Sequence, residues 1–213
     1  MITIPELVAQ ALGSFLDMET RGRFGASHAA VTELLPYAAK LTLECIGNSD
    51  ALYHNIEHSM LVTLVGHDIL VGRALQRATT AGDYANFIMA CLTHDIGYFR
   101  GVVHGDEDAV FVADVTGRTV RLPIGASDAA FAPYHVDRSK LFVAERLDGI
   151  EGLDAARIAR AIEYTRFSYL PVADGRTRRS ARRGGPLVAR GRLDRPARRS
   201  QLHEKGERAV LRI

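Results

Sequence analysis

At 213 residues, 47% of them hydrophobic, the chain is long enough for one domain with a substantial core and too short for two. No apolar run approaches the length of a membrane span, and the first residues lack the basic start and apolar core of a signal peptide. Cys45 and Cys91 both lie in apolar surroundings. We therefore expect a cytoplasmic protein with no membrane partner, in which both cysteines are reduced core residues.

The net charge of +2 is unevenly distributed along the chain. Residues 176–213 contain thirteen arginine and lysine residues against three acidic ones, so the preceding part is acidic. The basic segment has no apolar periodicity. The sequence thus predicts a domain over residues 1–170 and an arginine-rich tail over residues 171–213, which we expect to be disordered.

Apolar spacing predicts three helices in the first part of the chain. Residues 5–16 form the first, with proline in its opening turn. Ser27 caps the second, which runs to Gly47 and is expected to be kinked or split at Pro36. Capping residues at 48–50 precede a third helix, which contains His54 and His58 and continues to about residue 77.

The second part of the chain alternates between helix and a different pattern. Asp83 opens a helix that ends at the His94-Asp95 pair, where Gly97 suits a helix stop. Residues 110–112 and 119–122 flank a turn and predict a small β-hairpin, preceded by an acidic loop (106–108) expected to be solvated. Two more helices follow, at 133–147 and 153–167. The predicted fold is all-α, with one β-hairpin inserted near 105–125.

Two short stretches carry the candidate chemistry. His54 and His58 stand four residues apart, a spacing that places both imidazoles on one face of a helix. His94 and Asp95 end a second apolar run, so two helix segments can present three imidazoles and a carboxylate to one place. Imidazole nitrogen and carboxylate oxygen suit a divalent ion that stays open to water and phosphate.

The segments Tyr-His-Asn-Ile-Glu-His (53–58) and Leu-Thr-His-Asp-Ile-Gly-Tyr (92–98) resemble the HD superfamily of metal-dependent phosphohydrolases. The first segment is similar to that of cyclic-nucleotide phosphodiesterases and their bacterial relatives. The resemblance implies an HD-like helical array over roughly residues 1–170, with His58, His94 and Asp95 as metal ligands and His54 as the proton donor to the leaving oxygen. The ion could be Zn, Mg, Mn or Fe.

Other polar residues admit two interpretations each. Asn55 either orients a phosphate or caps a backbone group. His135 and Asp137 open a helix after the insertion. The resemblance implies that they bind a second metal or a substrate phosphate; the alternative is that they are ordinary polar residues at the start of a helix. The second His-Asp pair, His67-Asp68, lies about half a revolution round the helix from His58 and is expected to face away from the site, exposed to solvent.

The resemblance breaks after residue 167. HD phosphohydrolases complete the metal site with an aspartate from a later helix, but Asp174 and Asp194 lie outside any helical pattern. Codons can be chosen for residues 190–202 so that the next reading frame encodes Ala-Ala-Asp-Leu-Ile-Gly-Gln-Leu-Ala-Asp-Pro-Asn, similar to the relatives' sequence. We hypothesise that the tail, from near Ser168, is read out of frame. The absent helix would leave apolar surface exposed near residues 54–70.

Three functions compete at this point. The first is metal-dependent hydrolysis of a small phosphoester, plausibly a nucleotide or cyclic nucleotide, with this particular chain weakened by the missing aspartate. The second is a non-catalytic module that binds a metal or a nucleotide. The third, nucleic-acid binding through the basic tail, is disfavoured because the tail has no aromatic residue after Tyr169 to stack on bases.

Overall fold

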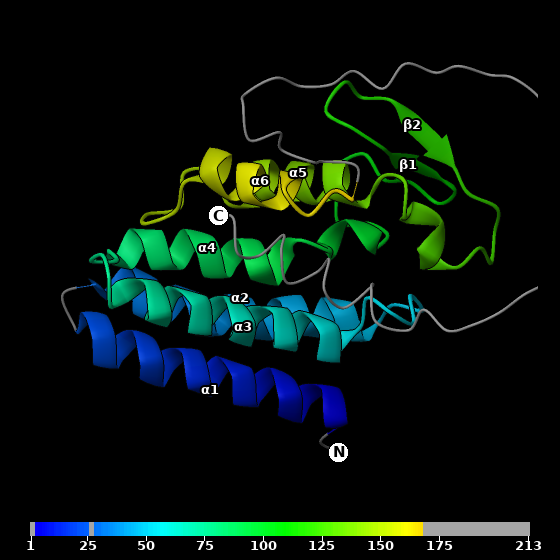
Figure 1. Cartoon of the computed structure of the whole chain (residues 1–213). Helices are drawn as coiled ribbons and strands as arrows, with labels where there is room; N and C mark the ends of the chain where they lie inside the picture. Colours follow the sequence, from blue (N-terminus) through cyan, green and yellow to red (C-terminus); the bar gives the residue numbers. More distant parts are fainter. Residues whose placement is uncertain (1–2, 26–27, 168–213) are drawn as a thin grey trace, which may run out of the picture. The chain divides into compact units, whose positions relative to one another are not determined.

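Helix α4 (Ala81–Thr93) lies at the centre of the fold, between a layer of three helices and a layer of two (Figure 1). In the computed structural model, which describes residues 3–25 and 28–167, every residue from Tyr84 to Phe99 is buried. This follows from the run Phe-Ile-Met-Ala-Cys-Leu at 87–92, which has no polar face to present to water. The polar residues that end α4 are therefore buried too.

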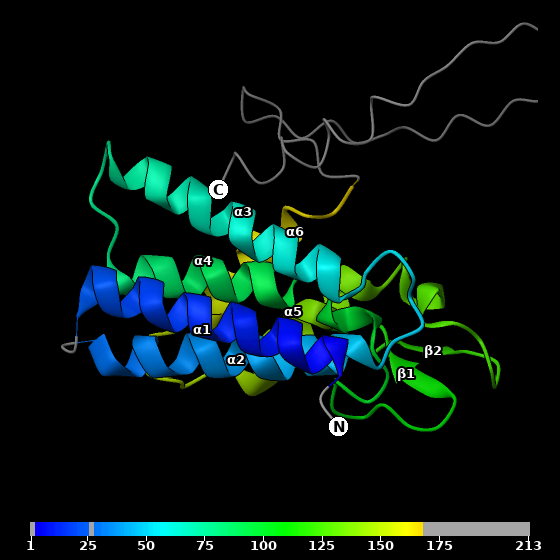
Figure 2. The same cartoon turned by 90° about the horizontal axis from the view of Figure 1, so that it is seen from below.

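The described chain is mainly helical with one small sheet, as the sequence predicts. On one side of α4 lie α1, α2 and α3; on the other lie α5 and α6 (Figures 1 and 2). The remaining elements, in chain order, are α1 (Ile4–Phe24), α2 (Ala29–Gly47), α3 (Ile56–Ala74), the 3-10 helix η2 (Ile96–Tyr98), β1 (Val110–Val112), β2 (Thr119–Arg121), the 3-10 helix η3 (Asp128–Phe131), α5 (His135–Arg146) and α6 (Ala155–Glu163).

Local capping sets several of the helix starts. Thr3 and Glu6 form a capping box at the start of α1, and Thr80 forms another with Asp83 at the start of α4. The Asp154 side chain accepts a hydrogen bond from the Arg157 backbone N–H and so caps α6. The predicted Ser27 cap lies outside the described residues.

Helix α2 runs unbroken through Pro36, so the expected split is wrong. The α1–α2 contact gives the reason. A Cβ added to Gly13 would lie 3.0 Å from the Pro36 carbonyl oxygen, which means that the two helices touch backbone to backbone at this point. Packing along the whole of α1 outweighs the single hydrogen bond that proline removes.

The two cysteines differ in burial. Cys91 is buried in α4, as predicted, whereas Cys45 is exposed. Cys45 stands between the buried Leu43 and Ile46, so it falls on the outward face of α2. Its assignment to the core is therefore wrong.

Helix α3 packs closely on α4 and lies at the edge of the helix array (Figure 2). A Cβ added to Gly66 would stand 2.7 Å from the Cys91 sulfur. The buried face of α3 is largely small or polar, while the apolar Leu61 and Val65 are exposed. Among the helices of the described ranges, none combines the length and apolar character needed to cross a bilayer.

The predicted β-hairpin is confirmed. Strands β1 and β2 pair antiparallel, with Phe111 opposite Val120. The Phe111 ring points into a small apolar cluster that also contains Tyr98, Leu122 and Phe131. The insertion thus has a core of its own, and Tyr98 joins that core to the end of α4.

A fully buried ion pair fastens the hairpin to α5. The Arg138 guanidinium donates two hydrogen bonds to Asp106, at 2.9 and 2.8 Å, and others to the carbonyl oxygens of Gly97, Phe99 and Val112. The side chains of Arg138 and Asp106 are 0% and 1% exposed. The prediction of a solvated acidic loop is therefore wrong for Asp106, because a charged partner outside the loop draws its carboxylate inward.

Replacing Arg138 with alanine is expected to destabilise the domain by about 3–5 kcal/mol, because the variant leaves the Asp106 carboxylate buried without its cation. Urea unfolding of the full chain measures the change. The matched control is Arg118→Ala, which removes a largely exposed pair with Asp114 and should cost less than about 1 kcal/mol. Equal losses in the two variants would contradict the assigned role of the buried pair.

Candidate metal centre

The Asp95 carboxylate, at the buried end of α4, collects three imidazoles. Its Oδ2 atom lies 2.6 Å from His54 Nδ1, 3.2 Å from His58 Nε2 and 3.0 Å from His94 Nε2. The two Nε2 atoms of His58 and His94 are 3.3 Å apart. The structure thus brings together the four residues singled out in the sequence.

These separations fit a metal ion. Two ligand atoms that each lie about 2.1 Å from one ion stand about 3.0–3.4 Å apart at octahedral or tetrahedral angles. The His58–His94, His58–Asp95 and His94–Asp95 separations fall in that range. His54, His58 and Asp95 each offer a ligand atom within 4.8 Å of the others, so this group could hold an ion.

Hydrogen bonding fixes which nitrogen of His94 faces the cluster. His94 Nδ1 lies 2.8 Å from the Cys91 carbonyl oxygen, which can only accept, so Nδ1 carries the proton. In the neutral ring Nε2 then presents a lone pair to a carboxylate oxygen 3.0 Å away. A proton, in the imidazolium form, or a metal ion must therefore lie between these two atoms, and a backbone carbonyl on the remote nitrogen is typical of metal-ligating histidines.

Electrostatics reinforce the same grouping. Burial alone would raise the pKa of Asp95, but His94 and the hydrogen bonds from the three imidazoles outweigh it and hold the pKa well below its usual range. Burial also disfavours a charged His94, yet Asp95 and the Cys91 carbonyl prevail and raise the pKa of His94. The carboxylate is therefore ionised, and the site attracts positive charge.

Asn55 caps α3 and so decides where His54 lies. The Asn55 side-chain oxygen accepts a hydrogen bond from the His58 backbone N–H at 3.0 Å, which makes Asn55 the N-cap residue. Of its two interpretations, the structure supports the cap. His54 precedes the cap and belongs to the loop between α2 and α3, so its expected place on the same helix as His58 is wrong.

Helix α5 holds the segment after Asp95 in place. The Ser139 hydroxyl donates to the His94 carbonyl at 2.7 Å and accepts from the Gly97 N–H at 2.9 Å. A Cβ on Gly97 would lie only 2.0 Å from the His135 carbonyl oxygen. The glycine is needed for this close approach and not as the helix stop expected from the sequence, because α4 has already ended at Thr93.

A stack of three rings lies beside the cluster. The Tyr98 ring stacks on His54, with 4.1 Å between centroids and 21° between planes, and on His135, with 4.4 Å and 18°. His135 Nδ1 lies 2.8 Å from the Ala132 carbonyl oxygen, and its Nε2 lies 3.9 Å from Asp95 Oδ1. Burial, then the Asp95 charge, raises the pKa of Tyr98 to about 12, so the tyrosine is neutral.

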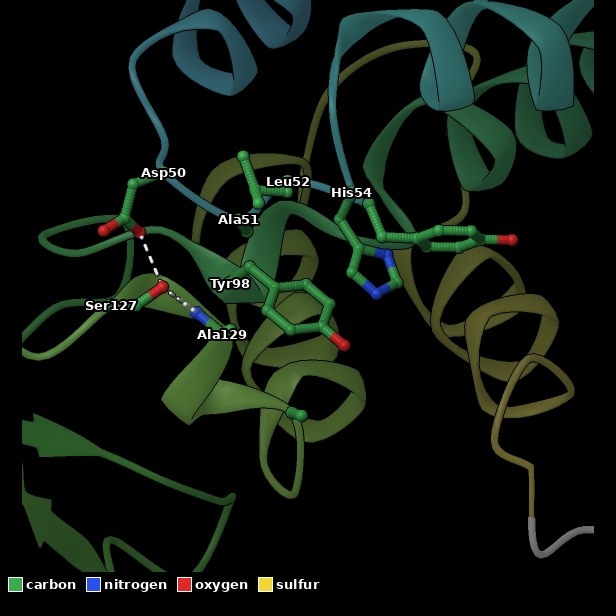
Figure 3. A pocket seen from close by; sticks show the side chains of 9 residues that line it. Asp50, Ala51, Leu52, His54, Tyr98, Ser127 and Ala129 are labelled. Atoms are coloured by element: carbon green, nitrogen blue, oxygen red, sulfur yellow. Dashed lines mark hydrogen bonds between the residues drawn. The ribbon is translucent and has the colours of Figure 1, made fainter.

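A cavity of about 360 Å³ opens next to these rings. Figure 3 shows the rings of His54 and Tyr98 on one side of it and Asp50 with Ser127 on the other. Asp50 accepts hydrogen bonds from the Ser127 hydroxyl and the Asp128 backbone N–H, and the backbone bond is the main reason that the pKa of Asp50 is lowered. A small molecule in this cavity would reach His54.

Other candidate residues are occupied elsewhere. Asp137 accepts hydrogen bonds from Lys140 and Arg166 in a network that includes Glu163. These contacts do not support a role for Asp137 as a ligand of a second metal. Asp174 and Asp194, considered as a missing ligand, lie outside the described residues.

His67, the histidine of the second His-Asp pair, faces away from the site as predicted but is buried, so its expected exposure is wrong. Its Nδ1 lies 2.7 Å from the Tyr84 hydroxyl, and Phe15 packs against its ring. These partners come from α4 and α1. The helical periodicity of α3 alone does not show that these two helices contact it.

Sequence reasoning missed Tyr98, Ser139 and Asp50. A signal existed for Tyr98, which is a polar aromatic residue three positions after Asp95 at the end of a wholly buried run. Asp50 was considered only as a capping residue of the third helix. It instead accepts the first backbone N–H of η3, which is brought to it from 78 residues further along the chain.

Replacing Asp95 with asparagine is expected to weaken Zn²⁺ binding by at least about 100-fold, because it removes the one negative charge among the ligands. Competition titration with a chromophoric chelator measures the affinity. The control is Asp68→Asn, which alters the exposed aspartate of the second His-Asp pair and should change the affinity less than about twofold. Equal losses would mean that the ion binds elsewhere.

A pH-dependent contribution to stability is expected from the Glu163 network. The hydrogen bond from Arg166 prevails over burial and, with Lys140, lowers the pKa of Glu163 to about 2. The ordinary value is about 4.3, so the stabilisation is complete above that pH and is lost as the pH falls towards 2. Glu163→Gln should lower the unfolding temperature at pH 7, and the difference should vanish near pH 2; a constant difference would refute the assignment.

Comparisons with known proteins give one result. The family model described as Npun_R2479-like matches residues 3–190, which includes the whole described domain and part of the basic segment. The match continues past Ser168, so it marks no boundary there. Neither the curated proteins nor the solved structures include a match. The chain belongs to the Npun_R2479-like family.

Proposed function

We propose that the protein is a metal-dependent phosphohydrolase of the HD type, acting on a small phosphoester. One observation carries the proposal: the Nε2 atoms of two imidazoles and an oxygen of a buried carboxylate converge at 3.0–3.3 Å beside a cavity. Such a donor set suits a divalent ion with open coordination positions. The order of the motifs, with His54 and His58 before His94 and Asp95, supports the HD resemblance.

His58, His94 and Asp95 are the proposed ligands, and Zn, Mg, Mn and Fe are all compatible with their nitrogen and oxygen donors. When bound, the ion supplies Lewis-acid stabilisation of the phosphoryl oxygens and a water molecule of lowered pKa. The ligands come from the first turn of α3 and the end of α4, which are both held by packing. The site is therefore preformed.

His54 is the proposed general acid. Its Nδ1–H donates to Asp95 at 2.6 Å, shorter than the ligand separations and typical of a charge-assisted hydrogen bond. This bond orients the imidazole, which also lines the cavity. The second ring nitrogen is thus the one that can deliver a proton to a leaving oxygen in the cavity.

His135 remains a candidate for a second ion or for a phosphate oxygen, because its Nε2 faces Asp95 Oδ1. Asp137 is no longer a candidate for these roles, since its carboxylate is neutralised by Lys140 and Arg166.

The cavity lining favours a substrate of low charge. The described lining residues include Leu52, Tyr53 and Tyr98 but no lysine or arginine. A polyphosphate would find no cation there to pair with, whereas a phosphodiester with an apolar or aromatic group would fit. A cyclic nucleotide or a linear nucleotide diester belongs to this class. A cytoplasmic location of the protein stays a prediction.

The test is hydrolysis of bis(4-nitrophenyl) phosphate by the full chain with Zn²⁺, Mg²⁺ or Mn²⁺, beside a form in which the neighbouring frame follows residue 167. We expect the restored form to hydrolyse the ester and the chain as written to be much slower, because the former regains the second aspartate. His54→Gln in the restored form should lower kcat by about 10²–10⁴-fold even when the site is saturated with metal. The control His67→Gln should retain more of its turnover.

Two results would overturn parts of this proposal. Metal binding without turnover in both forms would favour the second candidate, a non-catalytic metal-binding module. Equal turnover by both forms would refute the frame-shift hypothesis. Nucleic-acid binding through the tail predicts an affinity that disappears when residues 176–213 are removed.

A further inference from the structure

The Tyr98 ring touches the two imidazoles that lie beside the proposed ligands. Tyr98 is not itself a proposed ligand. Its near-parallel stacking on His54 and on His135 leaves the centroids of the two imidazoles 6.0 Å apart, so one tyrosine ring touches both. A ring held on a flat face loses freedom to rotate and to tilt. Figure 3 shows the Tyr98 and His54 rings against each other at the cavity wall.

The tyrosine is itself immobilised from two sides. Its backbone belongs to η2, which Ser139 and Gly97 fasten against α5. Its side chain is part of the apolar cluster that contains Phe111 and Phe131 of the inserted region. The insertion therefore supports a rigid aromatic wall at the metal cluster.

We propose that Tyr98 is the positioning residue of this site, which sets the orientation of both His54 and His135 relative to the Asp95 carboxylate. His54 lies in a loop and is not held by helix geometry, so the stack and its hydrogen bond to Asp95 are what orient it. The stacked contact with His135 keeps His135 Nε2 directed at Asp95 Oδ1. The proposal rests on the proposed function for the roles of these histidines, but the stack is independent of any turnover.

The first test uses the metal-free protein and needs no activity. In ¹H–¹⁵N spectra of the imidazoles, the ring protons of His54 and His135 should resonate upfield because they lie over the Tyr98 face. His54→Gln and His135→Gln assign the two signals. Tyr98→Leu should abolish both upfield shifts, and Tyr98→Phe should retain them. Shifts that persist in the leucine variant would overturn the proposal.

The second test measures Zn²⁺ affinity of the same variants. Tyr98→Leu is expected to bind Zn²⁺ about 10- to 100-fold more weakly, because it loosens His54, whose hydrogen bond orients the ligand carboxylate of Asp95. Tyr98→Phe should rescue the affinity to within about threefold, since it keeps the ring and loses only the hydroxyl.

Phe111→Leu is the matched control, because Phe111 packs in the same apolar cluster and meets the Phe131 ring edge to face but contacts neither histidine ring of the stack. It should lower the unfolding temperature while both upfield shifts and the Zn²⁺ affinity stay close to wild type. If Phe111→Leu weakens Zn²⁺ binding as much as Tyr98→Leu, Tyr98 acts only through the core and the proposal is wrong. Absence of phosphoester hydrolysis in every form would refute the proposed function and leave these two readouts intact.

Discussion

An ionised carboxylate in the interior is the constraint on which this structure depends. Asp95 follows a helix with no exposed face, and its side chain is only 5% exposed. A charge so buried is costly unless other groups compensate it. Three imidazoles do so, from the α2–α3 loop, from the first turn of α3 and from the end of α4. The chain must therefore bring these three segments together, and any cation that binds inherits the same geometry.

The elements after Asp95 keep this arrangement rigid. Ser139 and Gly97 fasten η2 to α5, and the buried pair of Arg138 with Asp106 fastens the hairpin to both. Each contact depends on its neighbours, because Arg138 also donates to the carbonyl oxygens of Gly97 and Phe99. The β-hairpin thus takes part in the construction of the site, although none of its residues reaches the carboxylate.

Periodicity and histidine spacing predicted most of the architecture, including the helices, the hairpin and the four residues that converge. Several of the errors share one cause: they concern residues whose environment is set by residues distant in sequence. His67 is buried by partners from α1 and α4, and Asp106 is drawn inward by Arg138 from α5. Pro36 is tolerated because α1 packs along α2. Local patterns contain no information on such partners, so they predict the elements better than the burial of individual polar residues.

The spacing of His54 and His58 illustrates how one pattern can hold two geometries. Four residues apart, the pair fits one face of a helix, but the asparagine between them ends that possibility, because its side chain caps the helix after His54. His58 is then fixed by helix packing, and His54 by a hydrogen bond and an aromatic face. These settings suit different tasks. A ligand must keep its distance from an ion, whereas the proposed proton donor must hold one ring nitrogen at Asp95 and the other towards the cavity, an orientation that the hydrogen bond and the flat Tyr98 ring maintain.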